Sequence, residues 1–446
     1  MKLWRSFLAN GVAILFQKII RIADQLLLVP FFLTYWGAAY YGEWLTLSII
    51  PSILAFSDLG LGSAVSNSFV LAYAAGDKQK AANLKKSGLV IVTLSVILGM
   101  LITAAVVIGC HKMHVFDHSH INSKDAILAV LFIMISKLSS FYIQMIEGFF
   151  RGARKAALGS FLGSGSYLLN ILVGFCILLQ GGGVVEYAFS QLVISFLYTI
   201  IYASIGYQMI TLKGFNGVIL KSDLLDISKK GMGYLMTPIW QSIFFQGTTF
   251  VVRLTLGAET VAVFNTVRTV CRSVNQFFSI INGSIFPALQ YEYGRGNIEV
   301  VRKHFSIAVL VSMIVGVMGT IALVLFGLNI YEWWTKSILV VPMEVWNIFM
   351  LGVLLNGIWW TSTVTYRMTN QPYHFAVVST VTATLSVSIT YFLSINYGLV
   401  GAAIGCTLFE LIMAFYVLSD SCKLLGMNVR DLLIYIKQIR FVGGRL

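Results

Sequence analysis

The 446-residue chain has few charged residues. Asp, Glu, Lys and Arg together make up 11% of it, whereas hydrophobic residues make up 58%. Average soluble domains carry about 25% charged residues, so a water-soluble globule of this length would lack the polar groups that cover a surface. Disordered, collagen-like and nucleic-acid-binding chains are excluded as well, because they are polar or periodic. A lipid bilayer is the solvent that suits this composition.

Paired cysteines and catalytic motifs are also absent. The five cysteines form no Cys-x-x-Cys pair, so we expect no disulfide framework. His111, His114 and His118 have ligand-like spacing on a helix, but a run of this kind is more often a solvated polar loop. No Gly-rich phosphate loop or nucleophile elbow is present. We therefore expect no metal, no cofactor and a protein that is not an enzyme.

Twelve stretches of the chain are long and apolar enough to cross a bilayer as helices, which takes about 20 mostly apolar residues each. They are continuously apolar and do not alternate as barrel strands do. We therefore predict an all-α integral membrane protein with twelve transmembrane helices. The predicted spans are 7–33, 43–72, 87–109, 125–147, 158–180, 185–208, 232–256, 261–289, 304–330, 342–366, 374–396 and 399–420.

The basic residues between the spans predict the orientation in the membrane. Only Lys112, Lys124 and Lys336 fall on one side, and the other side carries most of the remaining lysines and arginines. Both termini are therefore expected in the cytoplasm. The net charge of +13 is explained by this asymmetry and by attraction to anionic membrane lipids, so it does not predict nucleic-acid binding.

The two halves of the chain are alike at an offset of about 220 residues. The sequence YAAGD at 73–77 is echoed by YGRGN at 293–297, and Gly37-Ala38 by Gly257-Ala258. Six spans in each half place both repeats the same way up, as in transporters with parallel repeats. We expect an N-terminal lobe over 1–215 and a C-terminal lobe over 216–446.

Two segments outside the spans are predicted to form amphipathic helices. In 209–231, Ser222 would cap a short helix that ends before Gly231. In the tail 427–446, apolar and basic residues separate onto two faces, so this helix is expected to lie on the inner leaflet.

Charged residues inside the spans need a reason, because a charge at the bilayer centre costs at least about 2.5–3.5 kcal/mol. The first span carries a polar stripe at helical spacing that must face protein or water. The eighth span repeats this arrangement, and the second, fourth and twelfth spans add single charges. The residues of interest are Gln17, Lys18, Arg21, Asp24, Gln25, Asp58, Lys137, Arg268, Arg272, Asn275, Gln276 and Glu410.

The sign of these charges points to an anionic ligand. The basic members outnumber the acidic ones, with Lys18, Arg21, Lys137, Arg268 and Arg272 against Asp24, Asp58 and Glu410. Because arginine binds phosphate oxygens in a bidentate fork, we take the basic and amide residues as candidate substrate ligands. Pairing within the protein is the alternative for each charge. The three carboxylates are candidates for ion coupling or for structural charge partners.

Four motifs are similar to those of one transporter family. They are VPFFLTYWGAAYYGEW at 29–44, SDLGLGSA at 57–64, Gly76-Asp77 before a basic loop, and YGLVGAAIG at 397–405. They resemble bacterial polysaccharide flippases of the O-antigen type, in the multidrug/oligosaccharidyl-lipid/polysaccharide exporter superfamily. The resemblance implies two six-helix lobes around a central cavity, in the bacterial inner membrane. It also implies that an undecaprenyl-diphosphate-linked oligosaccharide moves from the cytoplasmic to the periplasmic leaflet.

Two other functions compete with the flippase. An ion-coupled drug or organic-cation exporter of the same superfamily would need an acidic cavity. A membrane glycan polymerase or ligase would need a catalytic constellation on an outer loop, which 110–124 does not offer. For the flippase we expect alternating access, driven by an H⁺ or Na⁺ gradient or by polymerase and assembly proteins that remove the product.

Overall fold

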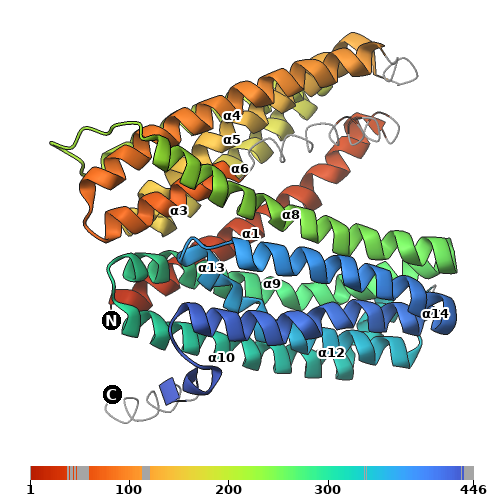
Figure 1. The fold of residues 1–446 in the computed structure, drawn as a ribbon. Helices are drawn as coiled ribbons and strands as arrows, with labels where there is room; N and C mark the ends of the chain where they lie inside the picture. Colours follow the sequence, from red (N-terminus) through yellow and green to blue (C-terminus); the bar gives the residue numbers. More distant parts are fainter. Residues whose placement is uncertain are drawn as a thin grey trace. The chain divides into compact units, whose positions relative to one another are not determined.

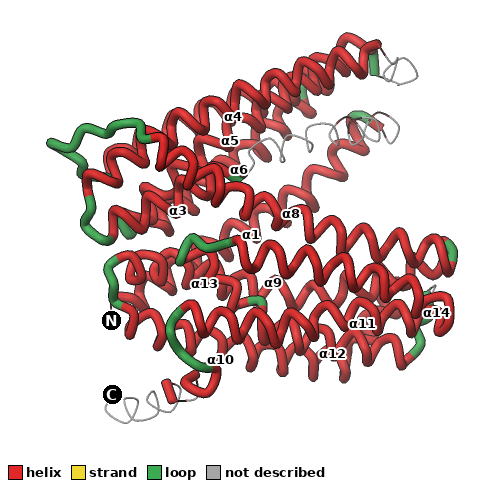
Figure 2. Tube along the Cα trace, viewed as in Figure 1, coloured by secondary structure: helices red, strands yellow, loops and turns green. Residues whose placement is uncertain are grey.

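The structure is a computed structural model that describes residues 2–37, 40, 44, 47, 60–112, 121–335, 337, 339–432 and 434–435. Within these residues the regular structure is helical, with no strand (Figure 2). The chain divides into two compact units, Met1–Met232 and Gly233–Leu446, which we call the N-terminal and C-terminal lobes. The lobe boundary predicted at 215/216 falls in the non-helical segment 210–220, ahead of the helix that connects the two units.

In the N-terminal lobe, several helices pack against one helix, which is labelled next to α4 in Figure 1. This helix, α5, packs on α3, α4 and α7, whereas α1 packs on α6. The second predicted span overlaps α3, and the rest of it lies mostly outside the described residues. The helices are α1 (Lys2–Tyr35), α3 (Leu61–Ala74), α4 (Lys78–Lys112), α5 (Ser123–Gly152), α6 (Ala156–Leu179), α7 (Val184–Met209) and the start of α8 (Lys221–Leu256).

In the C-terminal lobe, α12 packs on α9, α10 and α14. A π-helical segment, Leu323–Gly327, joins α10 to α11. The last two predicted spans are the two arms of α14, which separate at Gly398, where φ is 59°. The further helices of this lobe are α9 (Ala258–Gly294), α10 (Ile298–Ala322), α11 (Leu328–Thr335), α12 (Met343–Trp359), α13 (Val364–Met368) and α14 (Tyr373–Leu424).

The prediction of a separate amphipathic helix that ends before Gly231 is wrong. Residues 221–231 are the first turns of α8, which continues through Gly231 into the predicted seventh span. One glycine costs a helix only about 1 kcal/mol, which is too little to end a helix whose next residues are apolar. Of the predicted tail helix, 429–432 and 434–435 are helical, and 436–446 lie outside the described residues.

The repeat seen in the sequence is also present in the backbone. After α3, the Gly76 amide donates to the Tyr73 carbonyl (3.2 Å) and the Asp77 amide to the Ala72 carbonyl (3.1 Å). After α9, the Gly296 and Asn297 amides make the equivalent bonds, at 3.0 Å each. Gly76 and Gly296 have φ of 84° and 77°, a left-handed conformation that glycine adopts without strain. The two halves therefore share the turn that ends the second helical segment of each repeat.

Seven helical stretches of the described chain are long and apolar enough to cross a membrane. They begin at Lys78, Ser123, Ala156, Val184, Ile298, Met343 and Tyr373. Helix α9 is not among them, because it carries the polar stripe predicted for the eighth span. A membrane helix with such a stripe must cover it with protein or water. The stripe therefore marks where a site is to be sought.

Candidate functional site

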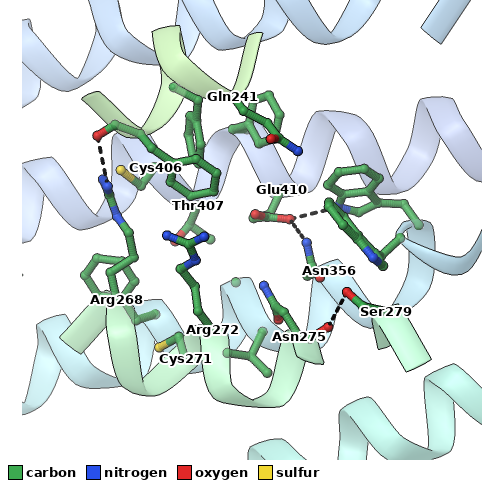
Figure 3. A pocket seen from close by; sticks show the side chains of 18 of the residues that line it. Gln241, Arg268, Cys271, Arg272, Asn275, Ser279, Asn356, Cys406, Thr407 and Glu410 are labelled. Atoms are coloured by element: carbon green, nitrogen blue, oxygen red, sulfur yellow. Dashed lines mark hydrogen bonds between the residues drawn. The ribbon is translucent and has the colours of Figure 1, made fainter. Parts of the chain in front are cut away.

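Four helices of the C-terminal lobe enclose a cavity of about 270 Å³ (Figure 3). Helices α8, α9, α12 and α14 each contribute side chains to its lining. One wall is aromatic, since Trp240 stacks on Phe409 with ring centroids 5.4 Å apart, and Phe244 stacks on Phe409 at 4.2 Å. The remaining wall carries two arginines, one glutamate and several carboxamides. The cavity is therefore amphiphilic, with charged groups held against ring faces.

Arg268 is held firmly by α8. Its guanidinium donates to the Phe245 carbonyl (3.1 Å) and to the hydroxyls of Thr248 and Thr249. It also lies over the ring of Phe264, 4.6 Å from the centroid, which is within the range of cation–π attraction. The residue is only 8% exposed, and no carboxylate within the described residues forms an ion pair with it. Its donors are thus used while its charge is not neutralised.

Arg272 lies one turn further along α9 and is exposed. Its guanidinium carbon stands 4.6 Å from the centroid of the Phe245 ring. Within the described chain this ring is its only recorded partner, with no hydrogen bond and no ion pair. Five N–H donors on a rigid fork therefore face the cavity unused. Such a group is poised to take a carboxylate or a phosphate in bidentate fashion.

Glu410 is the acidic group of the cavity. Its Oε2 accepts hydrogen bonds from Asn356 Nδ2 (2.9 Å) and from Trp359 Nε1 (2.8 Å). Both donors come from α12, so the carboxylate of α14 ties these two helices together. Neither arginine of the cavity lies within ion-pair distance of it in the described structure. Two cations and one carboxylate leave the cavity with a net positive charge.

Asn275, Gln276, Gln241 and Asn356 supply the carboxamides of the lining. The Asn275 Oδ1 is buried and accepts no hydrogen bond from the described residues. The same holds for Asn356 Oδ1, whose amide group is oriented by its bond to Glu410. Buried polar atoms are nearly always paired in proteins, so such exceptions call for an explanation.

The structure brings together the C-terminal half of the sequence-predicted site. Arg268, Arg272, Asn275, Gln276 and Glu410 all line the one cavity. This outcome follows from the helical spacing on α9 and from the packing of α14 beside it. The cavity lies inside the C-terminal lobe, and the expected cavity between two lobes stays a prediction.

The N-terminal candidates do not line this cavity. Gln17 and Lys18 are half-buried on α1, and a Cβ added to Gly163 of α6 would lie 3.4 Å from the Gln17 amide nitrogen. Lys137 is exposed on α5. The remaining candidates of this lobe fall outside the described side chains, so their roles stay predictions. These are Arg21, Asp24, Gln25 and Asp58.

Sequence reasoning missed a buried arginine in the N-terminal lobe. Arg151 is 4% exposed and donates to Asn67 Oδ1 (2.8 Å) and to the Ser66 hydroxyl. It also pairs with Glu147 one turn earlier, at 3.5 Å. Its place at the end of a span suggested an ordinary flanking charge. The polar pair Ser66-Asn67 inside an apolar helix was the available signal.

The aromatic wall of the cavity was missed as well. Trp359 and Trp360 both line it, as does Asn356 one turn before them. The signal was a tryptophan pair three residues after a polar residue in an otherwise apolar span. In the described residues no group of three metal-binding side chains occurs, and the run with His114 and His118 lies outside them.

Comparison with known families decides the assignment of the chain. A model of the family described as "Polysaccharide biosynthesis protein" matches residues 7–291, which is more than half of the chain. The chain belongs to the polysaccharide biosynthesis protein family. This agrees with the resemblance found in the sequence motifs. No curated protein gives a match.

Solved structures of transporters share the fold of this family member. A MATE protein in its bent conformation has a TM-score of 0.74 and 16% identity, with 95% of each chain covered. A mutant of a MATE protein has a TM-score of 0.73 and 18% identity, over 94% of this chain and 96% of that one. A MOP superfamily transporter from Pyrococcus furiosus has a TM-score of 0.72 and 15% identity, with 95% of each chain covered. The polysaccharide biosynthesis protein is therefore an all-α membrane protein with the two-lobe fold of the MOP superfamily.

Proposed function

We propose that this protein is a flippase that moves an undecaprenyl-diphosphate-linked oligosaccharide from the cytoplasmic to the periplasmic leaflet. The observation that carries the proposal is the Arg272 guanidinium, whose donors face the cavity without a partner in the described chain. A diphosphate is the part of such a substrate that needs a planar, charged donor. Membership of the polysaccharide biosynthesis family supports the glycan part of the proposal.

Arg268 supports the same assignment by its charge. It contributes a buried cation without a carboxylate partner in the described residues, and electrostatic attraction is stronger in a medium of low dielectric constant than in water. Both arginines thus attract the anion, and the free donors of Arg272 form hydrogen bonds with it. The polyprenyl chain, which is as apolar as lipid, stays in the bilayer while the glycan occupies polar space.

The proposed setting follows from the charge asymmetry of the loops. The protein lies in the bacterial inner membrane with both termini cytoplasmic, because the basic loops stay on the cytoplasmic side. Alternating access exposes the site to each leaflet in turn. An H⁺ or Na⁺ gradient, or polymerase and assembly proteins that consume the product, drives net transport.

An exporter of organic cations is the second candidate. The observation in its favour is Glu410, a carboxylate held among Trp359, Phe409 and other rings. Aromatic faces with a carboxylate are typical of sites for organic cations. The net positive charge of the cavity opposes this candidate.

The test is complementation in cells that lack their own polysaccharide flippase but make a matching glycan. Wild type restores surface glycan, whereas Arg272→Ala fails at equal expression. Arg253→Ala is the matched control, because Arg253 is an exposed arginine in the last turn of α8, away from the cavity lining. Glycan export that Arg272→Ala supports as well as wild type would contradict the proposal.

Glu410→Gln separates the two candidates. The glutamine oxygen can still accept from Asn356 and Trp359, so the variant removes the negative charge and preserves these contacts. The flippase retains glycan export within about tenfold, since roughly one hydrogen bond to substrate is weakened. A cation exporter loses its counter-ion and its resistance to cationic drugs.

A further inference from the structure

The cavity is complementary to a ligand that both donates and accepts hydrogen bonds. On the α9 side, Arg272 offers donors only. On the α12 and α14 side, Glu410 Oε1 accepts no hydrogen bond in the described chain, since both recorded bonds go to Oε2. A phosphate group carries acceptors and can satisfy the arginine. It has no donor for the carboxylate.

Asn356 strengthens the need for donors. Its Nδ2 donates to Glu410, which fixes the orientation of the amide, and its Oδ1 is left buried and unpaired in the described structure. The residue is 3% exposed, so bulk water does not supply the missing donor. Two ligand hydroxyls that enter the cavity bring one donor to this oxygen and one to Glu410 Oε1.

The side-chain amide of Asn275, in the wall of the same cavity, can either donate or accept a hydrogen bond. Neither end of its amide has a recorded hydrogen bond within the described residues, and its Oδ1 is buried in the cavity wall. Turning an amide by 180° exchanges donor and acceptor with almost no change of shape. Asn275 can therefore meet a hydroxyl in either role. Within the described residues its side-chain amide stabilises no neighbour by a hydrogen bond, and a buried polar group of this kind calls for an explanation such as a ligand.

The aromatic lining provides a surface for a ring. Trp359 and Trp360 meet edge to face, with centroids 5.3 Å apart, and Trp360 is half-buried at the cavity. The C–H face of a sugar ring is apolar and packs on an indole, while its hydroxyls point outward to polar groups. At about 270 Å³ the cavity is just below the ~300–1,000 Å³ of sites for drug-sized ligands. This volume suits one sugar unit and not a whole oligosaccharide.

We infer that this cavity is a subsite for a single sugar ring that carries an anionic group. The hydroxyls of the ring donate to Glu410 Oε1 and to Asn356 Oδ1, its C–H face packs on Trp360, and Arg272 binds the anionic group. The inference rests on the proposed function and names which part of the substrate this lobe recognises. Two sources supply such chemistry: the first sugar of a glycosyl diphosphate, and a uronic acid within the glycan.

The experiment is calorimetric titration of the purified full-length protein in detergent with four soluble probes. They are glucose 1-phosphate, glucuronate, glucose and pyrophosphate. An anionic sugar binds about tenfold more tightly than glucose and than pyrophosphate, because it alone engages both sides of the cavity. Tighter binding of glucose 1-phosphate identifies the linkage phosphate as the anionic group, and tighter binding of glucuronate identifies a uronic acid.

The variants Asn275→Leu and Asn356→Leu remove the amide groups with little change in volume. Each weakens binding of the anionic sugar about tenfold and leaves that of pyrophosphate within about twofold. Arg272→Gln abolishes the preference for the charged sugar over glucose. Asn396→Leu is the control, since Asn396 is exposed and bonds only to the Phe392 carbonyl of its own helix. Because Asn275 has no partner to lose, Asn275→Leu keeps its melting temperature, which tests the inference even if Asn356→Leu fails to fold.

Three results overturn the inference. The first is equal affinity for pyrophosphate and for the anionic sugars, and the second is no binding of any probe at millimolar concentration. The third is heat released by Na⁺ alone that depends on Asn275 and Glu410, which would make these oxygens a cation site. In all three cases a flippase that still requires Arg272 survives. Conversely, the probes could bind as stated while Arg272→Ala still exports glycan. That result would support the sugar subsite and contradict the proposed flippase function.

Discussion

Each lobe buries an arginine, and the two lobes use the charge differently. In the N-terminal lobe, Arg151 is bonded to Asn67 and Ser66 of α3 and paired with Glu147 of its own helix. In the C-terminal lobe, Arg268 is bonded to α8 without a carboxylate, and Arg272 has only a ring beside it in the described structure. Arg151 therefore connects helices and is neutralised by a carboxylate, whereas the positive charges of Arg268 and Arg272 remain available to attract an anionic ligand. A charge without a carboxylate partner, and not burial, distinguishes a binding arginine from a structural one.

We expect the loss of Arg151 in the N-terminal lobe to destabilise the protein more than any other substitution considered below. Arg151→Ala removes the guanidinium donors to the buried Asn67 Oδ1 and Ser66 hydroxyl, and we expect it to lower the free energy of unfolding by about 3 kcal/mol. The measurement is the melting temperature of the purified protein in detergent, beside Arg154→Ala, a variant of an arginine in the following turn. A melting temperature equal to that of wild type would show that the contacts of Arg151 do not hold α3 to α5.

A pair of glycines compares the packing of the two lobes. A Cβ at Gly148 of α5 would stand 2.9 Å from the Ser66 carbonyl oxygen, so Gly148→Ala forces α3 and α5 apart. At Gly352, in the cavity wall, the nearest atom would be the Thr407 hydroxyl at 3.6 Å, an ordinary contact. We expect Gly148→Ala to lower the free energy of unfolding by about 1–2 kcal/mol. We expect Gly352→Ala to have the melting temperature of wild type or a higher one. Equal losses at both positions would contradict the difference in packing.

Arg268→Met separates the effect of this arginine on stability from its effect on activity. Methionine keeps the volume and removes a buried charge that has no carboxylate partner in the described residues. Replacing a buried charge with an apolar residue is often neutral or stabilising, so we expect an unchanged or higher melting temperature. Glycan export falls about tenfold, because about 1.4 kcal/mol of attraction for the anion is lost. Loss of stability and activity together would class Arg268 with Arg151.

The sequence predicted the α9 stripe because helical spacing alone places Arg268, Arg272 and Asn275 on one face. Which arginine keeps free donors depends on contacts across helices, such as the Phe245 carbonyl of α8, and spacing along one helix holds no information about them. Arg151 was missed for the same reason, since its partner Asn67 is 84 residues away. The length of α8 was misjudged because local capping signals at Ser222 and Gly231 were outweighed by the apolar sequence that follows.

Transport of a fluorescent lipid-linked oligosaccharide in proteoliposomes tests directly whether Arg272 binds the substrate of a flippase. Wild type, Arg272→Ala and Arg253→Ala are compared at equal protein content, with folding checked by melting temperature. We expect Arg272→Ala to slow translocation by at least about tenfold, because a charge-assisted contact of about 1.5–3 kcal/mol is lost, and Arg253→Ala to stay within about twofold of wild type. Equal rates for wild type and Arg272→Ala would contradict the proposal that Arg272 binds the substrate.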